Sequence, residues 1–317
     1  MSTFTDRTVI ITGAGRGLGR EHALLFAGLG ANVVVNDNGA ATDGSGATAG
    51  PAHDVVAEIK AAGGRAVAHV GSVTDWSESE RMVRLAIETF GGLDVLVNNA
   101  GILRDRFLVT MSEAEWDSVM EVHLKGHFVP LHHAANHWRA ESKAGRPVNA
   151  AVVNTSSPSG LRGNPGQLNY AAAKAGIAAM TLVAARELDR IGVRVNAIAP
   201  VARTRLTSGS PAFAATVGRD AAGFDHWDPA NVSPLVVALS AADCRVSGRV
   251  FTVLGGHIGL QETWRETETF DKDRRWTVDE LEATLAVLPG GAPVFESSIK
   301  AHEARQEARP VSDAVDV

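Results

Sequence analysis

Short apolar runs alternate with longer segments of helical periodicity along most of the chain. The runs, rich in valine, isoleucine and alanine, predict buried strands at residues 8–12, 32–36, 65–70, 94–97, 148–155, 193–198 and 249–254. Amphipathic patterns bounded by capping residues or glycines predict helices between them, at residues 20–30, 53–62, 75–90, 112–138, 168–190 and 231–240. Because strands and helices alternate throughout, the pattern predicts an α/β fold with one doubly wound, parallel sheet of about seven strands.

A different pattern begins near Glu262, where a charged tail starts. Thr277 and Glu280 have the spacing of a helix capping box, and the helix after it carries one apolar face, formed by Val278, Leu281, Leu285 and Leu288. We therefore predict one α/β domain over residues 1–261 and a partly helical C-terminal extension over residues 262–317. The apolar face is expected to dock on the main domain or on a second subunit.

Composition and charge narrow the class of protein. The 317 residues are 45% hydrophobic and 21% charged, as in globular proteins, and the net charge of -6 argues against a nucleic-acid or membrane-surface partner. The single cysteine, Cys244, cannot form an intrachain disulfide, which fits a reducing compartment. Asp6 and Arg7 precede the first apolar run, so no signal peptide is expected, and the apolar stretch 176–185 is too short for a membrane span. These features predict a cytoplasmic location.

A glycine-rich turn follows the first predicted strand. Gly13, Gly17 and Gly19 remove side chains where a backbone can approach a pyrophosphate, and the helix after them offers free N–H groups. The spacing differs from G-x-G-x-x-G, but the strand before it and the helix after it favour a dinucleotide site. Asp37 follows about 20 residues later, as expected of an acid that binds an adenosine ribose. The alternative is that Asp37 only begins a turn, since D-N-G is strong turn chemistry.

Further stretches lie at the carboxyl ends of predicted strands, where doubly wound sheets bind ligands. Small and amide residues at 98–101 follow the fourth strand, and the irregular segment 199–228 follows the sixth and is a candidate substrate lid. Residues 38–50, which are rich in glycine, alanine and threonine, are expected to form a long flexible loop.

The candidate for acid–base chemistry is the only tyrosine of the chain, Tyr170, with Lys174 four residues later. On a helix the two side chains share a face, so the ammonium can favour phenolate and lower the tyrosine pKa from about 10. Ser157, at the end of the fifth predicted strand, is placed to hold a substrate oxygen beside them. The alternative for a Y-x-x-x-K spacing alone is an aromatic ring packed under a lysine stem.

Histidines are frequent on the predicted helix 112–138, at His123, His127, His132, His133 and His137. Two pairs have the i, i+4 spacing that a metal would accept. No cysteine or carboxylate pattern accompanies them, so we expect surface or packing histidines and no metal.

Together these motifs resemble the short-chain dehydrogenase/reductase family. The matching stretches span most of the first 260 or so residues: T-G-A-G-R-G-L-G (12–19), the acid at Asp37, N-N-A-G (98–101), Ser157, Y-A-A-A-K (170–174) and I-A-P-V-A-R-T (198–204). A closer resemblance, to the (3R)-hydroxyacyl-CoA dehydrogenase part of peroxisomal multifunctional enzymes and its bacterial stand-alone relatives, rests on V-V-V-N-D, N-N-A-G-I-L-R-D-R (98–106), V-H-L-K-G (122–126) and G-H-I-G-L (256–260).

The resemblance implies a Rossmann-type fold, a homodimer or homotetramer, and NAD-dependent interconversion of a secondary alcohol and a ketone. It implies that Ser157, Tyr170 and Lys174 are catalytic. His123 stands where most of the wider family carries the asparagine that completes a catalytic tetrad. The cofactor-binding residues that it implies are Gly13, Arg16, Gly17, Leu18, Gly19, Asp37, Ser72, Val73, Asn99, Ala100, Gly101, Lys174 and Pro200. Asp37 is expected to favour NAD over NADP, with Arg16 acting in the opposite sense.

Three hypotheses for function follow. The first is a (3R)-hydroxyacyl-CoA dehydrogenase, the second a dehydrogenase of a steroid or another hydrophobic secondary alcohol, and the third a dinucleotide-binding regulator without turnover. The intact serine, tyrosine and lysine set weighs against the third. A CoA ester also needs cations at the rim of its cleft, for which the candidates are Arg104, Arg106, Arg203 and Arg205. The alternative is that these arginines are solvated or paired with Asp105, Glu113 or Asp225.

Overall fold

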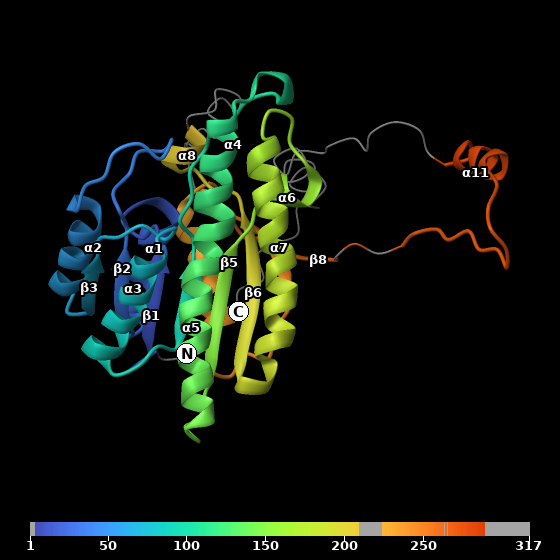
Figure 1. The fold of residues 1–317 in the computed structure, drawn as a ribbon. Coiled ribbons are helices and arrows are strands. Elements are labelled where there is room, and N and C mark those ends of the chain that lie inside the picture. Colours follow the sequence, from blue (N-terminus) through green and yellow to red (C-terminus); the bar gives the residue numbers. More distant parts are fainter. Residues whose placement is uncertain (1–3, 209–223, 263, 265, 289–317) are drawn as a thin grey trace, which may run out of the picture. The chain divides into compact units, whose positions relative to one another are not determined.

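The computed structural model describes residues 4–208, 224–262, 264 and 266–288. The chain divides into two compact units, residues 1–261 and 262–317. An eight-stranded sheet forms the centre of the first unit, in the order β3-β2-β1-β4-β5-β6-β7-β8 (Figure 1). The strands are β1 (Thr8–Thr12), β2 (Asn32–Asn36), β3 (Arg65–His69), β4 (Val95–Asn98), β5 (Ala150–Thr155), β6 (Val193–Pro200), β7 (Val250–Leu254) and β8 (His257–Gln261).

The prediction of a doubly wound α/β fold with about seven parallel strands is confirmed, and the sheet has an eighth strand, β8, that was not predicted. β8 pairs with β7 in antiparallel fashion, whereas the other neighbours pair in parallel. Leu254 pairs directly with His257, so the two strands are joined by a tight turn at Gly255 and Gly256. β8 alternates half-buried and exposed positions, so it lacks the continuous apolar run by which the other strands were predicted.

Helices and short turns connect the strands. They are α1 (Gly17–Gly28), α2 (Gly50–Ala61), α3 (Trp76–Phe90), α4 (Glu113–Met120), α5 (Gly126–Lys143), α6 (Pro158–Arg162), α7 (Leu168–Leu188), α8 (Arg205–Ser208) and α10 (Ser233–Ser240), with 3-10 turns at Leu108–Thr110, Asp189–Ile191 and Pro229–Val232. α2 begins three residues earlier than predicted, and Pro51 lies in its first turn, where a missing N–H costs nothing.

Two apolar layers hold these helices on the two faces of the sheet (Figure 1). Val9 and Ile11 of β1 belong to the layer that contains residues of α1, α2 and α10. Ile10, between them, belongs to the opposite layer with residues of α3, α5 and α7. Because successive strand side chains point to opposite faces, a strand buried on both faces must be apolar throughout. This packing brings the carboxyl ends of β1, β4 and β5 to one edge of the sheet.

The predicted helix 112–138 is divided in the structure and extends further, to Lys143. Its start is as predicted, because Ser112 and Glu115 form a capping box. A π-helical turn, Glu121–Lys125, then separates α4 from α5. Such a turn widens the helix locally and often lies at a functional site. Here it contains the buried His123.

The second unit contains α11 (Val278–Leu285), which begins with the predicted capping box of Thr277 and Glu280. None of the residues of α11 is buried, and Val278, Leu281 and Leu285 are all exposed. The docking of this apolar face therefore stays a prediction.

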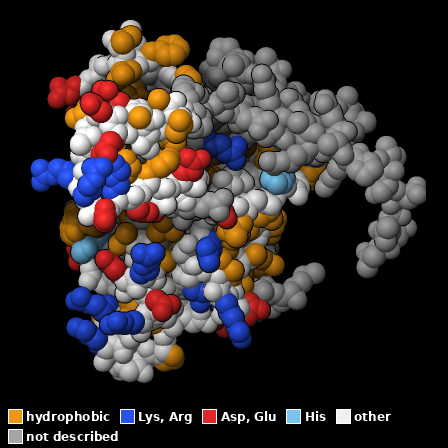
Figure 2. Space-filling view, turned by 90° about the vertical axis from the view of Figure 1, so that its right-hand side faces the viewer, with side chains coloured by type: hydrophobic (Ala, Val, Ile, Leu, Met, Phe, Trp, Pro, Cys, Tyr) orange, Lys and Arg blue, Asp and Glu red, His pale blue; other side chains and the backbone are white. Residues whose placement is uncertain are grey.

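The segment Leu168–Ile191 is long and apolar enough to cross a membrane, judged by length and composition alone. The apolar stretch 176–185 considered in the sequence is only part of it. In the fold this segment is α7 with the turn after it, and it packs against α6 and β6. Its apolar composition is thus that of a core helix. On the face shown in Figure 2, basic and acidic side chains are interspersed over the lower part of the molecule.

Candidate active site

The turn between β1 and α1 has the shape that a bound pyrophosphate needs. Gly13 and Gly17 have positive φ angles of +63° and +53°, which side chains rarely permit. A Cβ atom on Gly13 would lie 2.8 Å from the Cα of Ala100, so the backbone is closely packed there. α1 begins at Gly17 without a hydrogen bond from a capping side chain, which leaves its first N–H groups available to an anion.

Asp37 follows β2 and braces the glycine turn. Its Oδ2 accepts a hydrogen bond from the Gly15 N–H (2.8 Å), and its Oδ1 accepts one from the Gly39 N–H (2.6 Å). The second contact is the turn hydrogen bond that the D-N-G sequence predicts. Asp37 also lines a cleft at this edge of the sheet. Each of its carboxylate oxygens has a further lone pair that can accept a hydrogen bond from a ribose hydroxyl. The turn and the ribose interpretations are therefore compatible.

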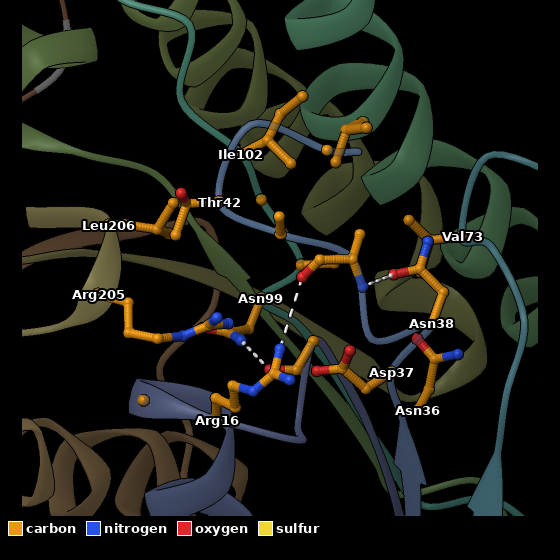
Figure 3. A pocket seen from close by; sticks show the side chains of 18 of the residues that line it. Arg16, Asn36, Asp37, Asn38, Thr42, Val73, Asn99, Ile102, Arg205 and Leu206 are labelled. Atoms are coloured by element: carbon orange, nitrogen blue, oxygen red, sulfur yellow. Dashed lines mark hydrogen bonds between the residues drawn. The ribbon is translucent and has the colours of Figure 1, made fainter. Parts of the chain in front are cut away.

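An open cleft with about 980 Å³ of empty volume lies at this edge of the sheet (Figure 3). Most of the predicted cofactor residues line it: Gly13, Arg16, Gly17, Leu18, Asp37, Ser72, Val73, Asn99, Ala100 and Gly101. Gly19, Lys174 and Pro200 are not among its lining residues in the described part of the chain. Gly19 lies behind the turn, where a Cβ atom would be 2.3 Å from the Gly13 carbonyl oxygen. Pro200 ends β6.

Residues 38–50 were expected to be a flexible loop, and most of this segment precedes α2 and contributes one wall of the cleft. Ala40, Ala41, Thr42 and Gly44 are lining residues that the sequence did not predict. The Leu103 N–H donates to the Thr42 carbonyl oxygen (2.9 Å), and Arg104 Nε donates to the carbonyl oxygen of Asp43 (2.8 Å). The loop is thus joined to the segment that follows β4, a contact between distant parts of the sequence for which composition gives no signal.

The two ends of the cleft differ in chemistry. Figure 3 shows Arg16, Asp37 and Arg205 toward one end and Ile102 at the other. The pKa of Arg205 is lowered by burial and by Arg16, whereas Asp37 raises it, so the three groups form one charged cluster. From the sequence, Arg205 was expected at the rim of a CoA cleft and not at this site. Thr204 and Leu206, beside it, also line the cleft, and of the two only Thr204 belongs to the motif I-A-P-V-A-R-T (198–204).

Asn99 connects the two strands that meet beneath the cleft. Its N–H donates to the Thr12 Oγ1 (2.9 Å), and its Nδ2 donates to the carbonyl oxygens of Thr12 (2.9 Å) and Gly13 (3.2 Å). These bonds fix the glycine turn on the end of β4. The side chain predicted to lie near a ribose therefore also has a structural function.

Ser157, Tyr170 and Lys174 come together near the Ile102 end of the cleft. Ser157 follows β5 and caps α6, and its side chain is hydrogen-bonded to that of Tyr170. Tyr170 and Lys174 lie one turn apart on α7, with Lys174 Nζ 5.5 Å from the centroid of the phenol ring. Tyr170 packs against the apolar cluster that contains Ile102, a lining residue. The fold thus places the predicted acid–base group beside the predicted dinucleotide site.

The pKa of Tyr170 is shifted in the direction opposite to that predicted. Burial raises it to about 12, the hydrogen bond with Ser157 acts in the lowering direction, and the charge of Asp105 raises it. Burial also lowers the pKa of Lys174 to about 7. The lysine side chain is almost fully buried, and its Nζ donates to the carbonyl oxygen of Thr155 (2.6 Å). Both groups therefore favour their neutral forms, because desolvation disfavours the charged form of each.

His123 lies beside the tyrosine, with its ring centroid 5.1 Å from that of Tyr170. Its Nε2 is 2.7 Å from the carbonyl oxygen of Ile102 and donates to it when that nitrogen carries the proton. Burial, followed by the charge of Lys174, lowers the pKa of His123 well below its usual value, so the ring is neutral. In the described part of the chain, no group of three or more His, Cys, Asp or Glu side chains could hold a metal ion.

Three of the four arginines expected at a CoA rim are held by other groups. The contacts are Arg104 Nε to the Asp43 carbonyl oxygen (2.8 Å), Arg106 Nε to Glu115 Oε1 (3.1 Å) and Arg203 to Asp225. The alternative of pairing with Asp225 thus holds for Arg203, whereas Arg106 pairs with Glu115, which was not among the carboxylates considered. The fourth, Arg205, lines the same cleft as Arg16 and Asp37.

The parallel sheet, the glycine turn and the grouping of serine, tyrosine and lysine define a dehydrogenase of the Rossmann type. The family of short chain dehydrogenases matches residues 7–210, and the chain belongs to this family. It is accordingly an oxidoreductase that acts on CH–OH groups with a nicotinamide dinucleotide. The resemblance stated from the motifs is confirmed.

Particular relatives cover most of the chain. The hydroxyacyl-CoA dehydrogenase ChsB1 of Mycobacterium tuberculosis is 45% identical over 289 residues, which are 89% of this chain and 88% of that protein. A crystal structure of a short chain dehydrogenase from Mycobacterium avium has a TM-score of 0.80 and 51% identity, and covers 90% of this chain and 94% of its own. Peroxisomal multifunctional enzyme type 2 of Mus musculus is 41% identical over 264 residues, 83% of this chain but only 34% of the mouse protein.

Proposed function

We propose that the chain is an NAD-dependent dehydrogenase that interconverts a (3R)-hydroxyacyl-CoA and the corresponding 3-ketoacyl-CoA. The observation that carries the proposal is the position of Tyr170, hydrogen-bonded to Ser157 and next to Lys174, near one end of a cleft whose glycine turn fits a dinucleotide. The names of two similar proteins, a hydroxyacyl-CoA dehydrogenase and a peroxisomal multifunctional enzyme, support this substrate class.

The side chains have distinct parts in the proposed reaction. Tyr170, as phenolate, takes the proton of the substrate hydroxyl, and in the reverse direction the phenol returns it. Ser157 donates a hydrogen bond to the substrate oxygen as the carbonyl forms. Lys174, as ammonium, stabilises the phenolate by its charge, and His123 holds the backbone at Ile102 beside the tyrosine. A nicotinamide dinucleotide held by the glycine turn and the residues that line the cleft would supply the hydride acceptor for the alcohol carbon.

The cofactor preference follows from the charges at the far end of the cleft. The carboxylate of Asp37 would accept hydrogen bonds from the ribose hydroxyls of NAD and would repel the 2′-phosphate of NADP. Arg16 and Arg205 oppose this preference, because both lie near Asp37 and would attract a phosphate. Asp37 is bound directly to the glycine turn through Gly15, so its charge is fixed where the ribose would lie, and we propose NAD.

The alternatives remain a hydroxysteroid or another hydrophobic secondary alcohol, and a regulator without turnover. Since Arg106 and Arg203 are paired with carboxylates, a cationic rim no longer favours a CoA ester over a steroid. The substrate assignment depends on the relatives instead. A regulator would not need a tyrosine hydrogen-bonded to a serine beside a buried lysine. The proposal also includes a homodimer or homotetramer in the cytoplasm, with residues 262–317 as a separate extension.

A substrate panel tests the proposed function. The protein is assayed with NAD on (3R)- and (3S)-hydroxyacyl-CoA of several chain lengths and on neutral hydroxysteroids, with formation of NADH as the readout. We expect the (3R) isomer to have the highest kcat/KM. Preference for a steroid or for the (3S) isomer would overturn the acyl-CoA assignment, and binding of NAD without turnover of any alcohol would favour the regulator.

A further inference from the structure

Unpartnered polar atoms gather around Lys174 in the interior. Four side chains there each carry a buried nitrogen or oxygen that has no hydrogen-bond partner among the described residues: Asn98 Oδ1, His123 Nδ1, His127 Nε2 and Thr155 Oγ1. Thr155 supplies the carbonyl oxygen to which Lys174 donates, and Asn98 Nδ2 donates to the backbone oxygen of His127 (3.2 Å). Since buried polar atoms are nearly always paired, such a cluster needs an explanation.

His127 is the member of this cluster that the proposed reaction does not use. It lies on α5, one helical turn after His123, and is as fully buried as that residue. Burial lowers its pKa well below the usual value, and the charges of Lys174 and His123 lower it further. The ring is therefore neutral, with one protonated nitrogen and one acceptor nitrogen.

The tautomer of His127 follows from its neighbours. Hydrogen bonds with the backbone of His123 and Asn98 raise the pKa of the His127 ring. This is the effect of backbone oxygens that accept a hydrogen bond from a ring N–H. The unpartnered nitrogen is Nε2, so Nδ1 carries this proton. His127 thus presents the lone pair of Nε2 to the interior beside Lys174.

We propose that His127 is a positioning residue for Lys174: its Nε2 accepts a hydrogen bond from the lysine ammonium through one water molecule, and so keeps Lys174 charged beside Tyr170. Its catalytic consequence rests on the dehydrogenase function proposed above. An ammonium group has three donors, and the structure accounts for one of them, at the Thr155 carbonyl oxygen.

A neutral acceptor is what this lysine needs. The pKa of Lys174 is shifted by burial, with no neighbouring carboxylate contributing. The titratable groups that bear on this region are the neutral His123 on the π-helical turn and Asp105 after β4, which acts on Tyr170. A hydrogen bond to the ammonium form favours that form, so the Thr155 carbonyl and His127 Nε2 together oppose desolvation. A charged lysine in turn favours the phenolate of Tyr170.

The test uses the fact that Tyr170 is the only tyrosine of the chain. Protein labelled with ¹³C at the tyrosine Cζ gives one resonance, whose pH titration reports Tyr170 alone, with and without saturating NAD. The variants are His127→Leu, which removes the acceptor, and His127→Gln, which keeps an acceptor at similar reach. His133→Leu is the matched control, because His133 lies on the same helix and also has an unpartnered Nε2, but next to Trp76.

We expect His127→Leu to raise the titration of Tyr170 by about one pH unit and to move the rising limb of the kcat–pH profile upward by the same amount. At a pH on that limb, kcat falls about tenfold while KM changes little, since one pKa unit is a factor of ten. His127→Gln restores both readouts, and His133→Leu changes neither.

Unchanged tyrosine titration and pH profile in His127→Leu would overturn the proposal. Equal losses in the leucine and glutamine variants would also overturn it, because they would indicate packing rather than hydrogen bonding. The tyrosine titration needs no substrate. A shifted titration in a protein that oxidises no hydroxyacyl-CoA would therefore refute the proposed function and leave the His127–Lys174 contact standing.

Discussion

Lys174 holds its Nζ 5.5 Å from the ring centroid of Tyr170 while donating its short hydrogen bond to the backbone at Thr155. The two side chains share one buried environment, which raises the pKa of the phenol to about 12 and lowers that of the ammonium to about 7. Near pH 7 the phenol is thus uncharged, and the lysine is about half uncharged. Oxidation of an alcohol needs the opposite forms, phenolate and ammonium, so the charges that adjoin the pair determine the pH dependence of the reaction.

Tyr170→Phe is expected to abolish acid–base catalysis and to leave the fold intact, because the ring still packs against Ile102 and its neighbours. Loss of a positioned general acid/base reduces kcat about 10²–10⁴-fold. NAD affinity, followed by fluorescence titration, should change little. A variant that turns over at the wild-type rate would exclude Tyr170 as the base.

Lys174→Met is expected to make the protein less active and more stable, in a manner that depends on pH. The folded-state pKa of about 7 lies below the usual 10.5, so the unfolded chain binds more protons and stability rises with pH between these values. The penalty of burying the ammonium, up to about 5 kcal/mol at 1.36 kcal/mol per pKa unit, is full below pH 7 and absent above 10.5.

Urea unfolding of both proteins at pH 7 and pH 10 measures this penalty. The stability gain of Lys174→Met, reduced by the lost hydrogen bond to Thr155, should be larger at pH 7. A gain independent of pH would mean that Lys174 has an ordinary pKa in the folded protein.

Replacement of Asp37 by asparagine is expected to shift the cofactor preference toward NADP. The substitution removes the repulsion of a 2′-phosphate and leaves Arg16 and Arg205 in the cleft. The ratio of kcat/KM for NAD and NADP measures the change, and Asp37→Asn combined with Arg205→Ala should partly reverse it. Arg203→Ala is the matched control, since that arginine is paired with Asp225. Equal use of NADP by the wild-type protein would show that the arginines outweigh Asp37.

Deletion of residues 262–317 tests the docking of the apolar face of α11. Burying one leucine side chain contributes about 1.5–3 kcal/mol, so a docked face should raise the melting temperature by several degrees or hold an oligomer together. Melting curves and light scattering of the shortened chain check both effects. A truncated protein that keeps the melting temperature and the oligomeric state of the full-length protein would show that the face is not docked.

Most of the sheet could be predicted because burial on both faces makes a strand apolar throughout, as in Val9 to Ile11. β8 lacked this signal, since it lies at an edge and exposes Ile258 and Leu260. The π-helical turn around His123 could not be predicted either, because its residues do not differ from those of an ordinary helix. The starts of two helices were predicted correctly, because the capping boxes at Ser112 and Thr277 are present as their spacing indicates.

The candidate site was predictable where it depends on neighbours in sequence and not where it depends on burial. Tyr170 and Lys174 lie on one face of a helix, as their spacing requires. The predicted direction of the pKa shift of Tyr170 was wrong. The sequence shows the neighbouring lysine but not the desolvation, which is the largest cause of the pKa shifts of both groups. The ion pair of Arg203 with Asp225 was one of the alternatives left open by the sequence. The placement of Arg205 beside Asp37 is a contact between loops that only the folded chain brings together.

The backbone contact between Thr42 and Leu103 has a kinetic consequence for a protein that turns over. Together with the Arg104 contact to Asp43, it joins two walls of the cleft in which the dinucleotide is proposed to lie. We expect exchange of spent for fresh cofactor to require the breaking of these contacts, and such openings are commonly slower than chemistry. We expect a burst of NADH in the first turnover, close to one equivalent per site, followed by a slower steady rate set by cofactor release.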